Sequence, residues 1–263
     1  LPTQTLPPAT HTNCYVLGVS GGERIIVDPA AKSKEALDIL RNKVREIEST
    51  GSKIVATIFT HKHPDHIGDL ENISEIYQAP IWTSKETLEI IPKSESDKIL
   101  KEGDDFKLIG KGESISWSVI ETHGHCPGHI CLVGDAGIIS GDNVTVIGTI
   151  LVPSSDGDMN QYLEGLERIK NLNPPLLFPG HGPFSANPQR LLNRYITHRN
   201  DRHMLVYNAV KNNNKELASI AKKSYEDTPD AHPALLIDQT LSHLKGHIKS
   251  ENIREEDGRY YIN

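Results

Sequence analysis

The sequence predicts an α/β protein with a small helical appendage at its C-terminal end, and three observations support this. Short β-branched runs such as Ile54 to Phe59 alternate with segments of helical periodicity such as residues 34–48. Polar clusters directly follow several of these runs, which is where α/β proteins gather functional groups. From Pro188 onward the composition changes to helices, and the chain closes with a hairpin pattern over 253–262.

The first half of the chain begins with two β-rich runs, 11–18 and 23–28, joined by Ser20-Gly21-Gly22, a pattern typical of a hairpin. Ser33 is placed to cap the helix over 34–48, which ends at Thr50-Gly51. After the buried strand Ile54 to Phe59, the patterns predict a helix over 65–77, a strand at 81–82, a helical turn over 87–91 and strands over 106–109 and 115–121.

The second half continues with a second hairpin and then becomes mainly helical. The predicted elements are strands over 130–133 and 137–140, a helix over 159–172, a strand over 176–178, helices over 188–212, 215–224 and 232–249, and a hairpin over 253–262. Helices followed by a two-stranded wing suggest a winged-helix-like appendage. We therefore expect a catalytic domain over residues 1–186 and a C-terminal extension over 187–263.

Composition places the chain among ordinary soluble proteins. Of its 263 residues 37% are hydrophobic and 24% charged, and no run of eighteen apolar residues is present, so we expect no membrane segment. The net charge of −7 argues weakly against non-specific binding to a polyanion. Three cysteines, Cys14, Cys126 and Cys131, are too few for a disulfide framework, which predicts a cytoplasmic (intracellular) location.

The stretch His61-Lys62-His63-Pro64-Asp65-His66 follows the strand that ends at Phe59. Imidazole and carboxylate are ligands that Zn²⁺ and similar ions take from proteins, and four such groups in six residues are costly to bury without partners. Ordinary surface histidines are the alternative interpretation. Further polar clusters downstream favour a metal site.

Three more clusters also come directly after predicted strands. They are Thr122-His123-Gly124-His125-Cys126-Pro127-Gly128-His129, Gly141-Asp142 and Pro179-Gly180-His181-Gly182. Asp28 ends an earlier strand, where it either forms a turn or accepts a hydrogen bond that orients a metal-ligating histidine.

These clusters together resemble the metallo-β-lactamase superfamily. Its signature is H-x-H-x-D-H, then a His in a T-P-G-H-like loop, then an Asp and a G-H. The resemblance implies an αββα sandwich and two divalent metal ions, with zinc expected first. It assigns His61, His63 and His125 to the first metal, Asp65, His66 and His181 to the second, and Asp142 to a bridge between them.

The histidine-rich loop departs from the family pattern at His123, where the family commonly has proline. We expect His125 to be the ligand and His123 to face solvent or to support a ligand. For His129 a hydrogen-bonded structural role is expected rather than ligation. Cys126 is surplus once three histidines are counted, although a thiolate can bind such metals.

The ligands suggest a hydrolytic mechanism with Asp65 and His66 as its catalytic residues. Two metals about 3.5–4 Å apart share a water, lower its pKa towards about 7 and polarise the bond under attack. A bridging hydroxide then needs no side-chain base, and no Ser-His-Asp or Cys-His motif is apparent. Asp65 is expected both to bind the second metal and to orient the nucleophile.

The C-terminal part more narrowly resembles the β-lactamase-like protein 2 group of endoribonucleases, through Tyr195-Ile-Thr-His198-Arg199-Asn200 and the helical appendage. The predicted substrate is therefore single-stranded RNA. Residues that could track its phosphates follow the long helix: Arg190, Arg194, His198, Arg199 and Arg202. A solvated helix face, with Asp201 beside it, is the competing interpretation.

Two other function classes stay open. The first is an acyl hydrolase of the same superfamily with a β-lactam, lactone or hydroxyacyl-thioester substrate, since the same nucleophile attacks carbonyls. The second is a non-hydrolytic iron/redox or binding module, because iron fits this ligand set as well as zinc does. Three roles stay open for the C-terminal appendage, which are to form a homodimer, to cap the cleft or to contact substrate.

Overall fold

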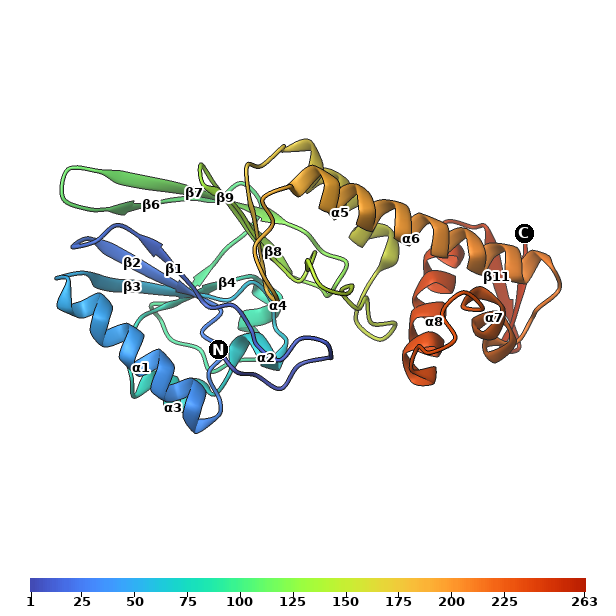
Figure 1. The fold of residues 1–263 in the computed structure, drawn as a ribbon, viewed down its shortest axis with the longest axis horizontal. Helices are drawn as coiled ribbons and strands as arrows, with labels where there is room; N and C mark the ends of the chain where they lie inside the picture. The colour runs from blue at the N-terminus through green and yellow to red at the C-terminus, as the bar shows by residue number, and fades with distance from the viewer. The chain divides into compact units, whose positions relative to one another are not determined.

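The computed structural model describes residues 1–263, which form two compact units (Figure 1). The first unit contains Leu1–Thr122, Gly128–Thr149 and Asn173–Pro188, and the second contains His123–Pro127, Ile150–Leu172 and Gln189–Asn263. The second unit thus includes nearly all of the predicted extension 187–263. It also takes in two segments from the middle of the chain.

The first unit contains a mixed five-stranded sheet. Its strands, in spatial order, are β1 (Tyr15–Gly18), β2 (Glu23–Val27), β3 (Lys53–Ile58), β4 (Ile81–Thr83) and β5 (Lys98–Ile99). β1 and β2 form the antiparallel hairpin expected from Ser20-Gly21-Gly22, and the other neighbours are parallel. The central strand β3 has a buried C-terminal half, as its apolar run predicts.

A second five-stranded sheet lies face to face with the first (Figure 1). Its spatial order is β10 (Leu177–Pro179), β9 (Gly137–Gly141), β8 (Ile130–Gly134), β7 (Ser114–Glu121) and β6 (Asp105–Ile109). β10 is parallel to β9 and the other pairs are antiparallel. Ile25 and Ile58 of the first sheet share one core with Val119 and Leu132 of the second.

Helices cover the outer face of the first sheet. In α1 (Lys34–Ser49), capped by the Ser33 hydroxyl, Leu40 and Val44 pack with Ile26 of β2. α3 (Leu70–Ser74) adds Ile73 to the same cluster, and α4 (Lys85–Leu88) is a single turn. The expected sandwich of two mixed sheets with helices outside is confirmed.

The predicted continuous helix over 65–77 is wrong. The segment forms two short helices, α2 (Pro64–Ile67) and α3, separated by Gly68 and by Asp69, which caps α3. Gly68 has φ +74°, and a Cβ there would lie 2.7 Å from the backbone of Ala31. The close approach of a neighbouring loop therefore requires a glycine and ends the helix.

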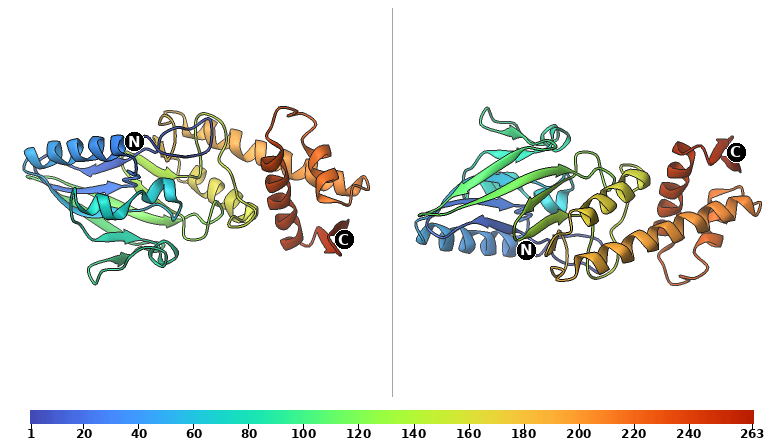
Figure 2. Two further views of the ribbon diagram at one scale, coloured as in Figure 1. Left: turned by 90° about the horizontal axis from the view of Figure 1, so that it is seen from below. Right: turned by 90° about the horizontal axis from the view of Figure 1, so that it is seen from above.

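The second unit is mainly helical and carries the predicted terminal hairpin (Figure 2). Its elements are α5 (Met159–Asn171), α6 (Pro188–Lys211, which enters the unit at Gln189), α7 (Leu217–Ser224), α8 (Pro233–Lys249), β11 (Ile253–Glu256) and β12 (Arg259–Ile262). α7, α8 and the hairpin pack on the C-terminal half of α6 through Val206, Ile220, Leu244 and Ile253. No helix of either unit has the length and apolar character needed to cross a bilayer.

Candidate metal centre

Three of the predicted clusters meet in the first unit, each delivered by the end of a strand. The loop after β3 carries His61 and His63, and α2 starts at Pro64 and presents Asp65 and His66. Asp142 follows the last residue of β9, and His181 lies two residues beyond β10. His61, His66, Asp142 and His181 are all buried.

Four of these side chains point their donor atoms at one another. The Nε2 atoms of His66 and His181 lie 3.4 Å apart. Each is also 3.4 Å from one oxygen of Asp142, and His181 Nε2 is 3.5 Å from Asp65 Oδ2. An ion with tetrahedral bonds of about 2.1 Å separates its ligands by about 3.4 Å. The donor types and their spacing therefore fit one divalent cation.

Asp28 and Thr60 fix the orientation of two of these rings. Asp28 accepts from the backbone N–H of Thr60 at 2.8 Å, from its hydroxyl at 2.7 Å and from His66 Nδ1 at 2.9 Å. Because the Thr60 hydroxyl donates to Asp28, its oxygen accepts from His61 Nδ1 at 3.0 Å. Asp28 thus directs Nε2 of both His61 and His66 into the site, which is the second of the two roles that the sequence left open for it.

The N-terminal segment fixes His181, a contribution that the sequence did not reveal. His181 Nδ1 donates to the carbonyl of His11 at 2.9 Å, and the Thr12 hydroxyl donates to the carbonyl of Asp65 at 2.7 Å. Asn13 donates to the carbonyls of Pro179 and Gly182 on either side of His181. Backbone carbonyls are common to all residues, so the sequence of this segment gave no such signal.

Two of the three residues expected to bind the first metal lie in this unit, and they are His61 and His63. Their ring centroids lie 4.8 Å apart with the planes at 85°, so the rings meet edge to face. The donor atoms of His61, His66 and Asp142 all lie within 4.8 Å of one another. His61 therefore adjoins the four-donor set of the second metal.

His125 belongs to the second unit, in the loop His123–Pro127. It is buried, and its Nδ1 donates to the carbonyl of Leu151 at 2.7 Å. Gly124 has φ +134°, and a Cβ there would lie 2.3 Å from the backbone nitrogen of Tyr162. His123 is half-buried. Ligation by His125 stays a prediction.

The carboxylates of the site are ionised at neutral pH. Burial raises the pKa of Asp65, but hydrogen bonds from His181 and Thr5 and the charge of His66 bring it down to about 2. Burial likewise raises the pKa of Asp142, and His66 and His181 hold it well below its usual range. Burial lowers the pKa of His181, but its bonds to Asp142 and Asp65 raise it to about 10. Two carboxylates facing basic nitrogens are a donor set that suits a divalent ion, which displaces the protons on binding.

Comparison with known proteins decides the family. The model of the metallo-beta-lactamase superfamily matches residues 7–181, which include every predicted metal ligand. The chain belongs to the metallo-beta-lactamase superfamily. The family consists mostly of metal-dependent hydrolases, so a hydrolase-type function follows from membership.

Individual relatives of this superfamily agree with the resemblance seen in the sequence. A beta-lactamase-like protein 2 homolog of Caenorhabditis elegans is 29% identical over 228 residues, which is 83% of this chain and 72% of that protein. An atrochrysone carboxyl ACP thioesterase of Aspergillus fumigatus is 25% identical over 211 residues, 80% of this chain and 62% of that one. A beta-lactamase domain protein from Burkholderia ambifaria shares the fold, with a TM-score of 0.77 at 24% identity, covering 98% and 89% of the two chains.

The residues predicted to track phosphates lie on α6, outside the matched superfamily region, and they differ in exposure. Arg190, Arg194 and His198 are exposed. Arg199 and Arg202, however, are only 3% and 5% exposed. Arg202 therefore does not lie on the open helix face that its spacing predicted, and Arg199, which the family match added, is buried as well.

The two buried arginines are engaged inside the second unit. Arg199 donates to the carbonyl of Ile150 and, at 3.1 Å, to Gln239. Arg202 donates to the carbonyl of Ser224 and is paired with Asp227 at 2.9 Å. Arg199 and Arg202 therefore stabilise the packing of the second unit, since each guanidinium would lose these hydrogen bonds if it turned towards solvent.

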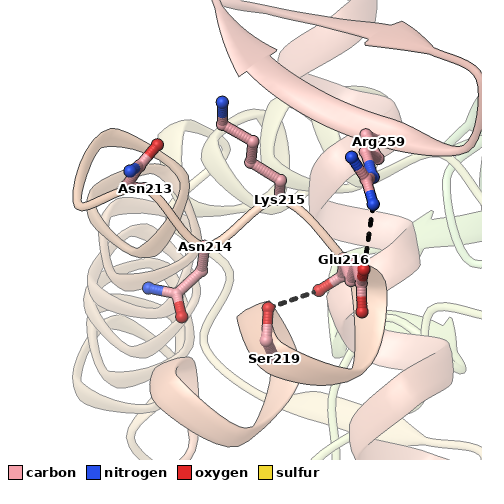
Figure 3. A pocket seen from close by; sticks show the side chains of 6 residues that line it. All are labelled: Asn213, Asn214, Lys215, Glu216, Ser219 and Arg259. Carbon is pink, nitrogen blue, oxygen red and sulfur yellow. Dashed lines mark hydrogen bonds and ion pairs between the residues drawn. The ribbon is translucent and has the colours of Figure 1, made fainter.

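A polar pocket of about 340 Å³ lies in the second unit, at the turn between α6 and α7 (Figure 3). It is lined by Asn213, Asn214, Lys215, Glu216, Ser219 and Arg259. Arg259 pairs with Glu216 at 3.5 Å, and Lys215 lies over the ring of Tyr261. It contains none of the predicted site residues, and its charges largely offset one another.

Proposed function

We propose that this protein is a binuclear metal-dependent phosphodiesterase that cleaves single-stranded RNA. The observation that carries the hydrolase part is the convergence of Asp65, His66, Asp142 and His181 at 3.4 to 3.5 Å. The RNA part is supported by similarity to a beta-lactamase-like protein 2 homolog, since the C-terminal part of the sequence resembles the endoribonucleases of that group. Arg190 and Arg194 are exposed on α6, and guanidinium groups on a surface bind phosphates.

Each ligand has a defined task in this proposal. His61, His63 and His125 would hold one ion, Asp65, His66 and His181 would hold the other, and Asp142 would be shared by both. When bound, the two ions, zinc in the first instance, lower the pKa of a shared water and polarise the bond under attack. Asp65, ionised at neutral pH, accepts a hydrogen bond from the attacking water and orients it towards the phosphorus.

An acyl hydrolase is the second candidate, and one comparison favours it. The Aspergillus fumigatus relative, named as a carboxyl ACP thioesterase, matches 80% of this chain. A thioester carbonyl is attacked by the same oriented water. The two candidates differ in salt dependence, because phosphate contacts by arginine weaken as salt rises, whereas attack on an uncharged acyl group does not depend on them.

The deciding experiment offers the zinc-loaded protein end-labelled single-stranded RNA, single-stranded DNA, an acyl thioester and a β-lactam in parallel. Asp142→Ala is the control, since it removes the bridging carboxylate. Cleavage of RNA that is lost in the control and falls between 50 and 300 mM salt (about sixfold in ionic strength) supports the proposal. Hydrolysis of the thioester or the lactam alone would replace it with the second candidate.

A further inference from the structure

We propose that His129 is a positioning residue of the metal centre: its neutral ring accepts the backbone N–H of Asp142 and so aims the Asp142 carboxylate at the ions. His129 is fully buried in the first unit at the start of β8. The distance from the Asp142 nitrogen to His129 Nε2 is 3.0 Å. The inference deepens the proposed function and rests on its metal centre, because Asp142 is the ligand assigned to both ions.

A single peptide group connects His129 with the centre. The peptide between Gly141 and Asp142 donates its N–H to His129, and its carbonyl accepts from the backbone N–H of Gly180 at 2.8 Å. The peptide plane is therefore held at both ends. Because this plane directly precedes the Cα of Asp142, its orientation determines where the carboxylate points.

The hydrogen-bond network defines the tautomer of His129. Nε2 must carry a lone pair, because it accepts from an amide. Nδ1 then carries the proton and donates to Thr122 Oγ1 at 2.9 Å. Asn143 Nδ2 also donates to Thr122 Oγ1, at 3.0 Å, so the Thr122 hydroxyl directs its own proton towards Cys131 Sγ at 3.3 Å. In this assignment the 3.3 Å approach of Asn143 Nδ2 to His129 Nδ1 is a contact and not a hydrogen bond, since both nitrogens carry protons. A protonated Nε2 would oppose the Asp142 N–H.

The backbone passes so close to the His129 ring and the Asp142 carboxylate that no side chain fits between them. Gly141 has φ +46°, and a Cβ there would lie 2.6 Å from His129 Nε2. A Cβ at Gly180 would lie 2.3 Å from Asp142 Oδ1 and 2.6 Å from His66 Cε1. Glycines therefore stand at both places where the backbone passes the ring or the carboxylate.

The same bonds explain why His129 is not assigned as a ligand. Its Nε2 lone pair is used by Asp142, and its Nδ1 bears a proton. The ring lies beside the His61 ring, with centroids 5.0 Å apart and planes at 31°. His129 thus supports the centre from the side, through the backbone of one ligand and packing on another.

Two variants separate the acceptor from the bulk of the ring. His129→Leu fills similar space without an acceptor, whereas in His129→Gln the side-chain oxygen reaches the place of Nε2. We expect His129→Leu to weaken affinity for the second equivalent of zinc by about 10-fold to 100-fold in chelator competition, the range found for outer-sphere partners of metal ligands. His129→Gln should recover most of that loss, and the visible spectrum of the cobalt-substituted protein should change with Leu and return with Gln.

The control is His232→Leu, at an exposed histidine before α8 whose side chain makes no cap hydrogen bond. It should leave zinc affinity unchanged. Wild-type affinity and an unchanged cobalt spectrum in His129→Leu would overturn the proposal. Because the readouts are affinity and spectrum, a failure to cleave RNA would count against the proposed substrate and not against His129.

The tautomer gives a test that needs no folded leucine variant. In ¹⁵N-labelled zinc-loaded protein, the ring signals absent from His129→Gln identify His129. We expect a protonated Nδ1 and an unprotonated Nε2, with a hydrogen-bond coupling between Nε2 and the Asp142 amide. A proton on Nε2 would show that the ring cannot accept from Asp142, and the proposal would fail.

Discussion

Asp28 orients the rings of His61 and His66, which are expected to bind different ions, although Asp28 itself is not an expected metal ligand. Its two oxygens accept from the Thr60 amide, the Thr60 hydroxyl and His66, and Thr60 passes the effect to His61. The carboxylate itself is buried, so every one of these bonds is made in the absence of competing water.

Replacing this carboxylate should therefore affect metal binding first. Asp28→Asn puts an amide N–H opposite a donor, and we expect zinc affinity to fall about 10-fold to 100-fold. Equilibrium dialysis against a chelator measures it. Asp38→Asn, on the exposed surface of α1, is the matched control and should have wild-type affinity. Equal affinities for the two variants would show that Asp28 does not orient the ligands.

Asp65 should be more important for turnover than for binding. Its backbone carbonyl is held by Thr12 and its side chain by His181, so Asp65→Asn can keep its place. We expect RNA cleavage to fall by about 10²-fold or more at saturating zinc, because the neutral amide is a weaker hydrogen-bond acceptor than the carboxylate and orients the attacking water less well. Metal content and turnover are measured on the same sample. Near-full turnover with both ions bound would remove this role from Asp65.

The site residues that sequence alone predicted are those that carry ligand atoms in a local motif. His61, His66, Asp142 and His181 are identified by residue type and spacing and then brought together by the ends of β3, β9 and β10. His11 acts through its carbonyl, which no residue type encodes. Arg202 was misread because a charge at helical spacing looks the same whether its partners are solvent or distant carbonyls.

At the scale of the elements, two glycines of similar φ allow a comparison, although Gly68 also has a ψ of −150°, a combination open essentially to glycine alone. Gly51 after α1 has φ +76° and Gly68 between α2 and α3 has φ +74°. A Cβ at Gly51 meets no atom within 4 Å, whereas one at Gly68 lies 2.7 Å from the backbone of Ala30 and Ala31. Only the second substitution combines strain with a steric clash.

We expect Gly51→Ala to lower the free energy of unfolding by about 1 kcal/mol, the cost of a left-handed alanine. Gly68→Ala should cost about 2 kcal/mol more, as overpacking adds to the strain. Urea unfolding followed by tryptophan fluorescence measures both, since Trp82 and Trp117 lie in the first unit. A smaller loss for Gly68→Ala than for Gly51→Ala would contradict the close approach seen here.

A cluster of histidines joins α6 to α8 in the second unit. The rings of His203 and His247 stack with centroids 3.5 Å apart, and His203 Nδ1 lies 3.1 Å from His243 Nδ1. Burial, then the neighbouring charge of His247, lowers the pKa of His203 to about 4. Burial, followed by Arg199, His203, His247 and Arg202, holds the pKa of His243 well below its usual range. Burial also lowers the pKa of His247, against its bond to the His203 carbonyl.

These histidines should make the second unit sensitive to acid. In the unfolded chain these histidines bind protons near pH 6.5, whereas in the folded unit they stay neutral to lower pH. The stability that they contribute is therefore full above pH 6.5 and declines as the pH falls towards about 4. His203 alone accounts for a loss of about 3 kcal/mol over this window. Urea unfolding followed by circular dichroism at 222 nm, at pH 7.5 and 5, measures it. His243→Phe should flatten the dependence, and an unchanged slope would show that other groups cause it.

At the scale of the whole molecule, features that depend on neighbouring residues could be predicted from the sequence, and features that depend on contacts between distant segments could not. The sandwich was predictable because strand patterns and turn residues such as Ser20-Gly21-Gly22 are local, and the helical extension because its periodicity is long. The placement of His123–Pro127 and Ile150–Leu172 with the second unit was not predictable, since it depends on contacts between distant segments. The break at Gly68 carried a local signal, but its cause is the neighbouring backbone of Ala31.

The central claim is that side chains from three strand ends hold metal ions in this fold. Anomalous diffraction at the zinc edge from crystals of the zinc-loaded protein tests it most directly. The account predicts an anomalous peak about 2.0–2.2 Å from Asp65, His66, Asp142 and His181, and a second about 3.5–4 Å from it beside His61 and His63. No peak among Asp65, His66, Asp142 and His181 in zinc-saturated crystals would contradict it.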